Sequence, residues 1–120
     1  MRAAQPYRIL EYLTSGGKGP FREWLDRLDL SVKARIQARI LRFEIGNLGD
    51  YKGIGEGVYE SRLDFGPGYR IYFGIEGGRL IVLLCGGSKG SQKRDIRQAQ
   101  GFWSDYLKRG KHGKTRERLE

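Results

Sequence analysis

The sequence predicts a small α+β fold, in which a mostly antiparallel four-stranded sheet carries two N-terminal helices on one face and is followed by a C-terminal helix. Two alternating runs are joined by Gly66-Pro67-Gly68, and an apolar run follows them directly. Helical periodicity occurs on both sides of this block. The chain has 120 residues, enough for one domain with its own core.

The N-terminal part contains one predicted strand and two predicted helices. Residues 7–13 have the pattern of a strand. Pro20 suits the first turn of a helix, and apolar residues at helical spacing extend this helix over 20–28. Ser31 can cap a second helix over 31–46. The outer face of the second helix is basic, and a solvated surface is the simpler explanation of that row, which contains Lys33, Arg35, Arg39 and Arg42.

The middle of the chain contains three predicted strands in a meander. Residues 46–57 hold five glycines without periodicity and are expected to form a loop. The strands follow over 58–65, 69–76 and 79–86. The third strand is apolar on both faces, which is typical of a central position in a sheet.

The alternation of side chains places Arg62, Arg70 and Tyr72 on one face of the first two strands of this meander. In the expected register, Asp64 faces Arg70 and Arg62 faces Tyr72, while Tyr72 faces Leu83 of the third strand. A slip of one residue would bury the arginines, so we expect them to lie opposite the helix-covered face. The simpler alternative is an ion pair between Asp64 and Arg70, with Arg62 only solvated.

The C-terminal part begins with a third predicted helix over 91–108, which Ser91 can cap. We therefore expect one domain over 1–108 and a basic, flexible tail over 109–120. The predicted core comprises Trp24, Ile36, Ile40, Leu63, Ile71, Phe73 and Val82.

The chain is strongly basic, with a formal net charge of +9 and an isoelectric point near 9.9. Residues 87–120 carry +6 of this charge, so an acidic or polyanionic partner is expected to contact the C-terminal third. Cys85 is the only cysteine, which excludes an internal disulfide and is consistent with a reducing cytoplasm. No apolar stretch is long enough to cross a bilayer, and we expect a cytoplasmic protein without a membrane partner.

The residue inventory excludes most catalytic chemistries. The only histidine, His112, lies in the expected tail, and one cysteine with one histidine cannot build a zinc site. No acidic cluster suggests a magnesium site, so neither a metal nor another cofactor is expected. Arginines and lysines remain, and these bind phosphate and stabilise charge that develops on it.

Several lysines and arginines outside the hairpin could take part in such a site. Lys89 precedes the third helix, whose N-terminal amides attract anions, and Lys52 precedes the hairpin. Lys93 and Arg94 begin the third helix and are expected to bind substrate with Lys52. RNA is the expected substrate because its 2′-hydroxyl is a built-in nucleophile, and a lysine of lowered pKa beside arginines could act as the base.

The order of several sequence blocks resembles the RelE/ParE toxin superfamily and, within it, the HigB-like addiction-module killer proteins. The resemblance covers roughly residues 5–108 and implies helices packed on one face of a mostly antiparallel sheet, with the first strand at its side. It further implies a toxin that cuts messenger RNA, usually on the ribosome, and that a helix-turn-helix antitoxin holds inactive. The blocks are Phe21-x-x-Trp24, Gly46-Asn47-x-Gly49-Asp50-x-Lys52, Gly57-Val58-Tyr59-Glu60-x-Arg62, Gly66-Pro67-Gly68-Tyr69-Arg70-Ile71-Tyr72, Gly86-Gly87-x-Lys89-x-x-Gln92 and Asp95-Ile96.

The resemblance also implies which residues act. Arg62 and Arg70 match the strand arginines of the family, and Lys89 and Lys52 match catalytic basic positions less closely. RelE members use a tyrosine after the last strand and some HigB members use histidines, whereas this chain has neither there. Tyr72 is therefore the candidate acid beside Arg62, Arg70 and Lys89.

Two other functions remain open on the sequence. A ParE-like inhibitor would bind gyrase through protein contacts and would need no catalytic arginines. A non-catalytic RNA-binding relic would need only the basic face. The arginines at 62 and 70 with Tyr72 favour a metal-independent endoribonuclease over the gyrase inhibitor.

Overall fold

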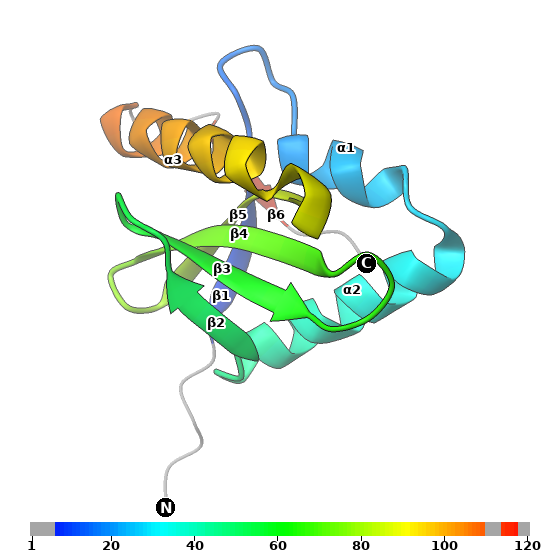
Figure 1. Cartoon of the computed structure of the whole chain (residues 1–120). Helices are drawn as coiled ribbons and strands as arrows, with labels where there is room; N and C mark the ends of the chain where they lie inside the picture. The colour runs from blue at the N-terminus through cyan, green and yellow to red at the C-terminus, as the bar shows by residue number, and fades with distance from the viewer. Residues whose placement is uncertain (1–6, 110–113, 118–120) are drawn as a thin grey trace, which may run out of the picture.

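A mixed six-stranded sheet forms the middle layer of the computed structural model, which describes residues 7–109 and 114–117 (Figure 1). The strands lie in the order β2-β3-β4-β5-β1-β6, and all neighbours are antiparallel except β1 and β5. The elements are β1 (Arg8–Tyr12), α1 (Pro20–Asp26), α2 (Leu30–Glu44), β2 (Asp50–Gly53), β3 (Val58–Leu63), β4 (Tyr69–Glu76), β5 (Leu80–Ser88), the 3₁₀ turn η1 (Lys89–Ser91), α3 (Gln92–Lys108) and β6 (Thr115–Glu117). The predicted α+β class is confirmed.

The first core lies between the sheet and the two N-terminal helices. Ile36, Ile40 and Phe43 repeat at i, i+4 and i+7 along α2 and are fully buried against the sheet. Phe21 and Leu25 of α1 join the same core. The predicted core residues Ile36, Ile40, Leu63, Ile71 and Phe73 are confirmed here, while Trp24 is only partly buried.

The second core lies on the opposite face of the sheet, under α3. Trp103 and Tyr106 of α3 stack with ring centroids 5.1 Å apart and pack toward Tyr72 and Val82. The prediction placed Val82 in the core without identifying a second one. Helices therefore cover both faces of the sheet, with α1 and α2 on one side and α3 on the other (Figure 1).

Two strands were missed, so the prediction of four strands is wrong for the described part of the chain. β2 lies within the expected loop at 46–57 and pairs with β3. All four of its residues are exposed, so no alternation of burial marks it in the sequence. Gly49, Gly55 and Gly57 have positive φ angles, which allow the sharp turns on either side of β2.

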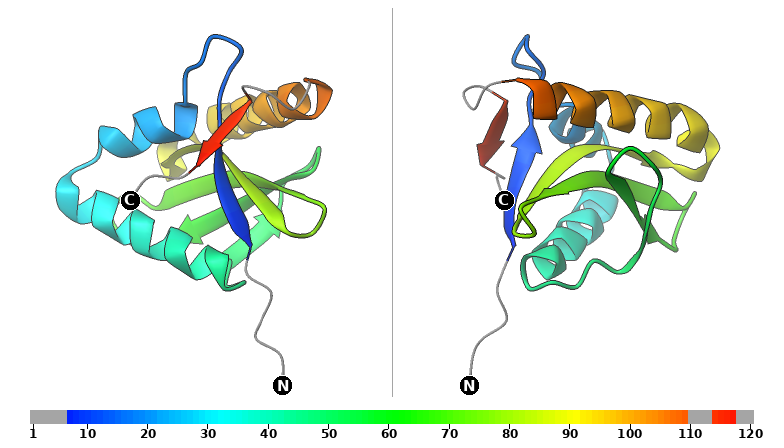
Figure 2. Two further views of the ribbon diagram at one scale, coloured as in Figure 1. Left: turned by 180° about the vertical axis from the view of Figure 1, so that it is seen from behind. Right: turned by 90° about the vertical axis from the view of Figure 1, so that its left-hand side faces the viewer.

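β6 lies within the expected flexible tail at 109–120 and pairs with β1 (Figure 2). The prediction of a flexible tail is therefore wrong for Thr115–Glu117, and His112 lies outside the described residues. The Glu11 carboxylate is fully buried and interacts with Arg22 of α1 and, at 3.6 Å, with Nε of Arg116. The buried Glu11 carboxylate attracts Arg116, and the free edge of β1 offers hydrogen bonds, which together explain why so polar a segment forms a strand beside β1.

The hairpin register differs from the expected one by two residues. Arg62 lies opposite Arg70, so the predicted pairing of Asp64 with Arg70 is wrong. The connection is longer than the expected three residues, because Phe65 leaves the strand and packs on Tyr69. A shift of two residues keeps every side chain on its predicted face.

A β-bulge between β4 and β5 contributes to the other difference in register. Tyr72 lies opposite Cys85 instead of the predicted Leu83. One residue of this shift arises at the turn, where Glu76 pairs with Leu80, and the irregularity between Tyr72 and Phe73 adds the second. A bulge adds one residue to one strand, which the alternation of the sequence does not reveal. Arg62 and Arg70 still lie on the face of the sheet that points away from α1 and α2, as predicted, but α3 covers part of this face.

Replacing Gly74 with alanine should destabilise the protein by about 1–3 kcal/mol, because an added Cβ would lie 2.4 Å from the Trp103 ring. Gly101→Ala is the matched control, since its added Cβ meets nothing within 4 Å. That change should stabilise α3 by about 0.5–1 kcal/mol. Urea unfolding of both variants checks this, and equal stability of Gly74→Ala and the wild type would contradict the packing of α3.

Stability should fall between about pH 10 and pH 12 because of Tyr12. Burial and a hydrogen bond from its hydroxyl to Asp105 raise the pKa of Tyr12 from 10.0 to about 12. The unfolded chain releases this proton at lower pH than the folded protein, so rising pH favours unfolding in this window. Urea midpoints should decline more steeply there for the wild type than for Tyr12→Phe. Parallel declines would show that Tyr12 contributes nothing.

Candidate functional site

Two neighbouring cross-strand rows on the α3 side of the sheet bring several predicted site residues together. Residues that lie opposite each other in adjacent strands share a face, so each row forms one line of side chains. The first row is Asp50, Arg62, Arg70 and Gly87, and the second is Lys52, Glu60, Tyr72 and Cys85.

Arg62 and Arg70 are direct cross-strand neighbours. Like charges placed opposite each other in this way destabilise a sheet, so a nearby anion must offset them. Asp50 provides part of this charge, since its carboxylate lies 3.0 Å from Nη2 of Arg62. The Arg62 side chain remains 40% exposed and accessible to a ligand.

Arg70 is held much more firmly than Arg62. Its side chain is only 8% exposed, Nη1 donates a hydrogen bond to the Gly68 carbonyl at 2.7 Å, and Nε lies 3.6 Å from Glu60 Oε2. Within the described residues, neither the buried Nε nor Nη2 has a hydrogen-bond partner. Arg70 is therefore a fixed guanidinium in which only Nη1 is engaged in a hydrogen bond.

Glu60 is the anion that fixes this part of the sheet. Its fully buried Oε2 accepts hydrogen bonds from the Tyr72 hydroxyl at 3.0 Å and from Gln92 Nε2 at 2.9 Å. Oε1 of the same carboxylate is buried without a hydrogen-bond partner in the described structure. Glu60 thus connects β3 to Arg70 of β4 and to the first turn of α3.

Tyr72 does not fit the predicted role of proton donor. Its side chain is fully buried, and its hydroxyl proton is committed to Glu60. Burial first, and then the charge and hydrogen bond of Glu60, raise the pKa of Tyr72 well above its usual value. The tyrosine matches the predicted face but belongs to the packing under α3.

Lys89 lies beside Arg70 at the β3–β4 turn. Its main-chain N–H donates to the Pro67 carbonyl at 3.4 Å. A Cβ added at Gly68 would lie 3.2 Å from Arg70 Nη1 and 3.6 Å from Lys89 Cβ, so this turn approaches both residues closely. The Lys89 side chain is exposed.

The start of α3 is anchored on the sheet through Asp95. Its side chain is buried and accepts a hydrogen bond from the Ser91 hydroxyl. Gly87, opposite Arg70, leaves the room for this carboxylate, because an added Cβ would overlap Asp95 Oδ2. Asp95 and Gln92 fall in the sequence blocks quoted above, although neither was predicted to belong to the site.

The remaining predicted substrate-binding residues are placed differently. Lys52 is exposed on β2 opposite Glu60 and so belongs to the same face as the arginines. Lys93 is exposed on the first turn of α3. Arg94 lines a separate groove of about 660 Å³ between α1 and α3, away from Lys52.

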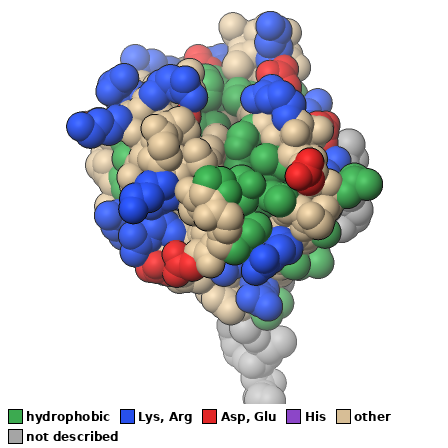
Figure 3. Space-filling model, turned by 45° about the vertical axis from the view of Figure 1, so that its right-hand side comes forward, with side chains coloured by type: hydrophobic (Ala, Val, Ile, Leu, Met, Phe, Trp, Pro, Cys, Tyr) green, Lys and Arg blue, Asp and Glu red, His purple; other side chains and the backbone are tan. Residues whose placement is uncertain are grey.

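One face of the molecule mixes apolar and basic areas. Figure 3 shows a face on which hydrophobic side chains gather in the middle and lysine and arginine side chains surround them.

Over residues 7–109 and 114–117, no cluster of three or more His, Cys, Asp or Glu side chains is placed to hold a metal ion. The same residues contain no helix long and apolar enough to cross a membrane.

Four cations therefore lie on neighbouring strands and at the β3–β4 turn, on one side of the sheet: Lys52, Arg62, Arg70 and Lys89. The anions beside them are already engaged, because Asp50 pairs with Arg62 and Glu60 binds Tyr72 and Gln92. Guanidinium groups bind phosphate oxygens through paired hydrogen bonds. The arrangement is suited to binding a phosphate and to stabilising negative charge that develops on it.

Comparisons with known proteins give one clear relationship. No family model matches the chain. A chain of the RelBE2 toxin–antitoxin complex of Mycobacterium tuberculosis is similar over 70% of this chain and 99% of its own length, with 22% identity and a TM-score of 0.43. At this score, the similarity assigns neither a fold family nor a function.

An uncharacterized protein of Haemophilus influenzae is 48% identical over 81 residues. The match covers 67% of this chain and 82% of that protein. Such identity over most of both chains establishes common descent, and the chain belongs to the same family as this Haemophilus influenzae protein.

Proposed function

We propose that the protein is the toxin of a toxin–antitoxin pair and acts as a metal-independent endoribonuclease on messenger RNA. The observation that carries this proposal is the direct cross-strand pairing of Arg62 with Arg70. Lys52 and Lys89 lie on the same side of the sheet. The resemblance of the sequence to RelE/ParE toxins supports the same activity.

The reaction uses a nucleophile that the substrate supplies. The 2′-hydroxyl attacks the adjacent phosphorus while the bond from phosphorus to the 5′-oxygen breaks, which leaves a 2′,3′-cyclic phosphate and a 5′-hydroxyl. Arg62 and Arg70 stabilise the charge that grows on the phosphoryl oxygens. Lys52 and Lys89 are the exposed groups beside the arginines. One would take the 2′-hydroxyl proton and the other would protonate the 5′-oxygen.

The proposed partners of such a toxin are an antitoxin and the ribosome. A helix-turn-helix antitoxin with an acidic contacting segment would neutralise the basic toxin and associate with it quickly. The ribosome would present the messenger RNA. Both partners match the net charge of +9.

Expression in bacteria tests the proposed function. Growth should stop, primer extension should map new breaks within transcripts, and co-expression of the neighbouring antitoxin gene should restore growth. Persistent toxicity with the neighbouring gene product at equal amounts would refute the pairing. Accumulated gyrase–DNA complexes with intact transcripts would instead identify a ParE-like gyrase inhibitor, the competing function. If transcripts stay intact and no such complexes accumulate, the remaining alternative is a non-catalytic RNA-binding protein.

A further inference from the structure

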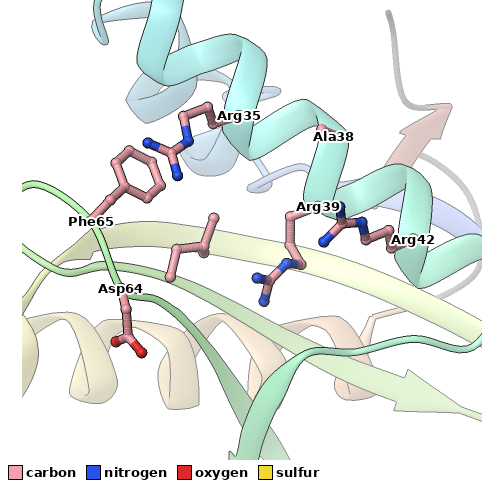
Figure 4. Close-up of a pocket in the computed structure, with 7 residues that line it drawn as sticks. Arg35, Ala38, Arg39, Arg42, Asp64 and Phe65 are labelled. Carbon is pink, nitrogen blue, oxygen red and sulfur yellow. The ribbon is translucent and has the colours of Figure 1, made fainter.

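A second basic site lies on the other face of the sheet, in a groove of about 200 Å³ between α2 and the end of β3 (Figure 4). Arg35, Arg39 and Arg42 project from one side of α2 toward this strand. Leu63 and Phe65 form the apolar part of the lining. We name this feature the α2 groove.

The three arginines of the α2 groove form no ion pair within the described residues. Asp64 points away from them (Figure 4). Like charges three and four residues apart on a helix destabilise it. Partial burial first, and then the charge of Arg42, lower the pKa of Arg39, and the charges of Asp50 and Asp64 offset only part of this effect.

The contacts hold the guanidinium groups in place without satisfying them. Arg35 lies over the Phe65 ring, with Cζ 3.7 Å from the ring centroid. Arg39 Nη1 lies 3.4 Å from both the Ser61 hydroxyl and the Arg62 carbonyl, distances at which hydrogen bonds are weak. Arg42 is exposed. Each guanidinium group therefore retains donors for an anion.

The spacing suits a chain of regularly placed anions. A helix rises about 1.5 Å per residue, so the three arginines follow one another at about 6 and 4.5 Å along α2. A nucleic-acid backbone carries one negative charge per nucleotide. We propose that the α2 groove binds the phosphate backbone of single-stranded RNA that flanks the nucleotides at the Arg62–Arg70 site, an inference that rests on the proposed function.

The composition of the lining favours RNA over an acidic protein segment. A docked peptide gains affinity mainly from buried apolar anchors, and the groove offers only Leu63 and Phe65. Leu63 is 5% exposed, and the Arg35 guanidinium covers the Phe65 ring. Guanidinium groups dominate the accessible lining, and they recognise phosphate bidentately.

The position of Arg39 connects the two basic sites. Its guanidinium contacts the main chain of Arg62, whose own side chain leaves the opposite face of β3. Only the thickness of one strand separates the two arginines there. RNA that passes over the end of β3 and the adjoining turn would contact the α2 groove on one side and the Arg62–Arg70 site on the other.

Ala38 provides a sharp test because it is exposed, lines the groove and lies four residues before Arg42. Ala38→Glu should place a carboxylate among the arginines while supporting the helix through an i, i+4 pair with Arg42. It should weaken binding of a short 2′-O-methyl oligoribonucleotide, which the 2′-hydroxyl reaction cannot cut, by about tenfold or more at low salt. Ala38→Gln is the matched control of equal size and should bind like the wild type. Equal binding by both variants would overturn the proposal.

A second variant measures the number of phosphates contacted. Replacing Arg35, Arg39 and Arg42 with glutamine should reduce the slope of log affinity against log salt by about two, since each phosphate on a single strand contributes about 0.7. The control with glutamine at Lys18, Arg27 and Lys108 removes the same charge from exposed positions elsewhere. Fluorescence anisotropy between about 50 and 200 mM salt gives the slopes, and circular dichroism confirms folding.

The outcomes separate the two proposals. If the wild type cuts and binds RNA but the groove variant keeps the slope of the control, the α2 groove is not an RNA site and the ribonuclease proposal stands. If the wild type neither binds nor cuts RNA, the proposed function fails and this inference fails with it. If a labelled oligoglutamate peptide binds the groove more tightly than RNA of equal charge, the occupant is an acidic protein segment and the RNA assignment is overturned.

Discussion

Replacing Arg70 with lysine should slow RNA cleavage by about 10²- to 10³-fold, the effect expected when a fixed donor to developing charge is lost. Lysine keeps a positive charge beside Glu60 but cannot reproduce the fork that contacts Gly68 and leaves Nη2 for the substrate. The measurement is the single-turnover cleavage rate of a short ribonucleotide oligomer. Arg62→Lys should also slow the reaction, because Arg62 is the other guanidinium at the site.

The choice of lysine follows from the burial of Arg70. Arg70→Ala would be a poorer test, because the side chain is 8% exposed and pairs with Glu60. Alanine would leave the buried Glu60 carboxylate without its partner and destabilise the fold. A loss of cleavage could then not be distinguished from a loss of folded protein. Arg97→Lys, the same exchange at an exposed position of α3, is the matched control and should cut RNA like the wild type. Wild-type cleavage by a folded Arg70→Lys protein would contradict the role of Arg70.

Replacing Glu60 with alanine should lower the free energy of unfolding by about 3–5 kcal/mol, because it leaves a buried guanidinium without its counter-ion. It also removes the acceptor for the Tyr72 hydroxyl and for Gln92, which connects β3 to α3. Glu60→Gln keeps a hydrogen-bond acceptor without the charge, so it should lower the free energy of unfolding by less than Glu60→Ala. Urea unfolding monitored by tryptophan fluorescence gives the values.

Asp50→Ala is the matched control for this prediction. Asp50 pairs with Arg62 at 3.0 Å, but their side chains are 56% and 40% exposed. Exposed ion pairs contribute about 0–1 kcal/mol, so this variant should unfold near the wild-type midpoint. Equal losses for Glu60→Ala and Asp50→Ala would show that the Glu60 network is not a special anchor of α3.

For the hairpin, the sequence predicted correctly which face of the sheet each residue occupies, but it did not predict which residues pair across the strands. Alternation has a period of two, so Arg62 and Arg70 share a face in any register that buries the aromatic residues. Two registers that differ by two residues satisfy this pattern equally, and packing of Phe65 against Tyr69 and Arg35 accompanies the observed one. That shift turned a predicted Asp64–Arg70 pair into the Arg62–Arg70 pair.

Other features depend on contacts between distant segments, which periodicity cannot show. β2 and β6 are short, polar strands that form by pairing with an existing edge, so their own residues carry little signal. The burial of Tyr72 depends on α3 covering the second face of the sheet. Glu60 was on the predicted arginine face, but its role as a buried anchor needed the position of Gln92.

The chemistry of the cleaved end tests the central claim most directly. Purified protein is incubated in EDTA with a ribonucleotide oligomer and with the same oligomer carrying one 2′-deoxyribose at the scissile position, with and without ribosomes. The account predicts a 2′,3′-cyclic phosphate and a 5′-hydroxyl from the first oligomer, and no cleavage of the second. Equal cleavage of the deoxy oligomer, or cleavage that EDTA abolishes, would contradict a metal-independent site built on Arg62 and Arg70.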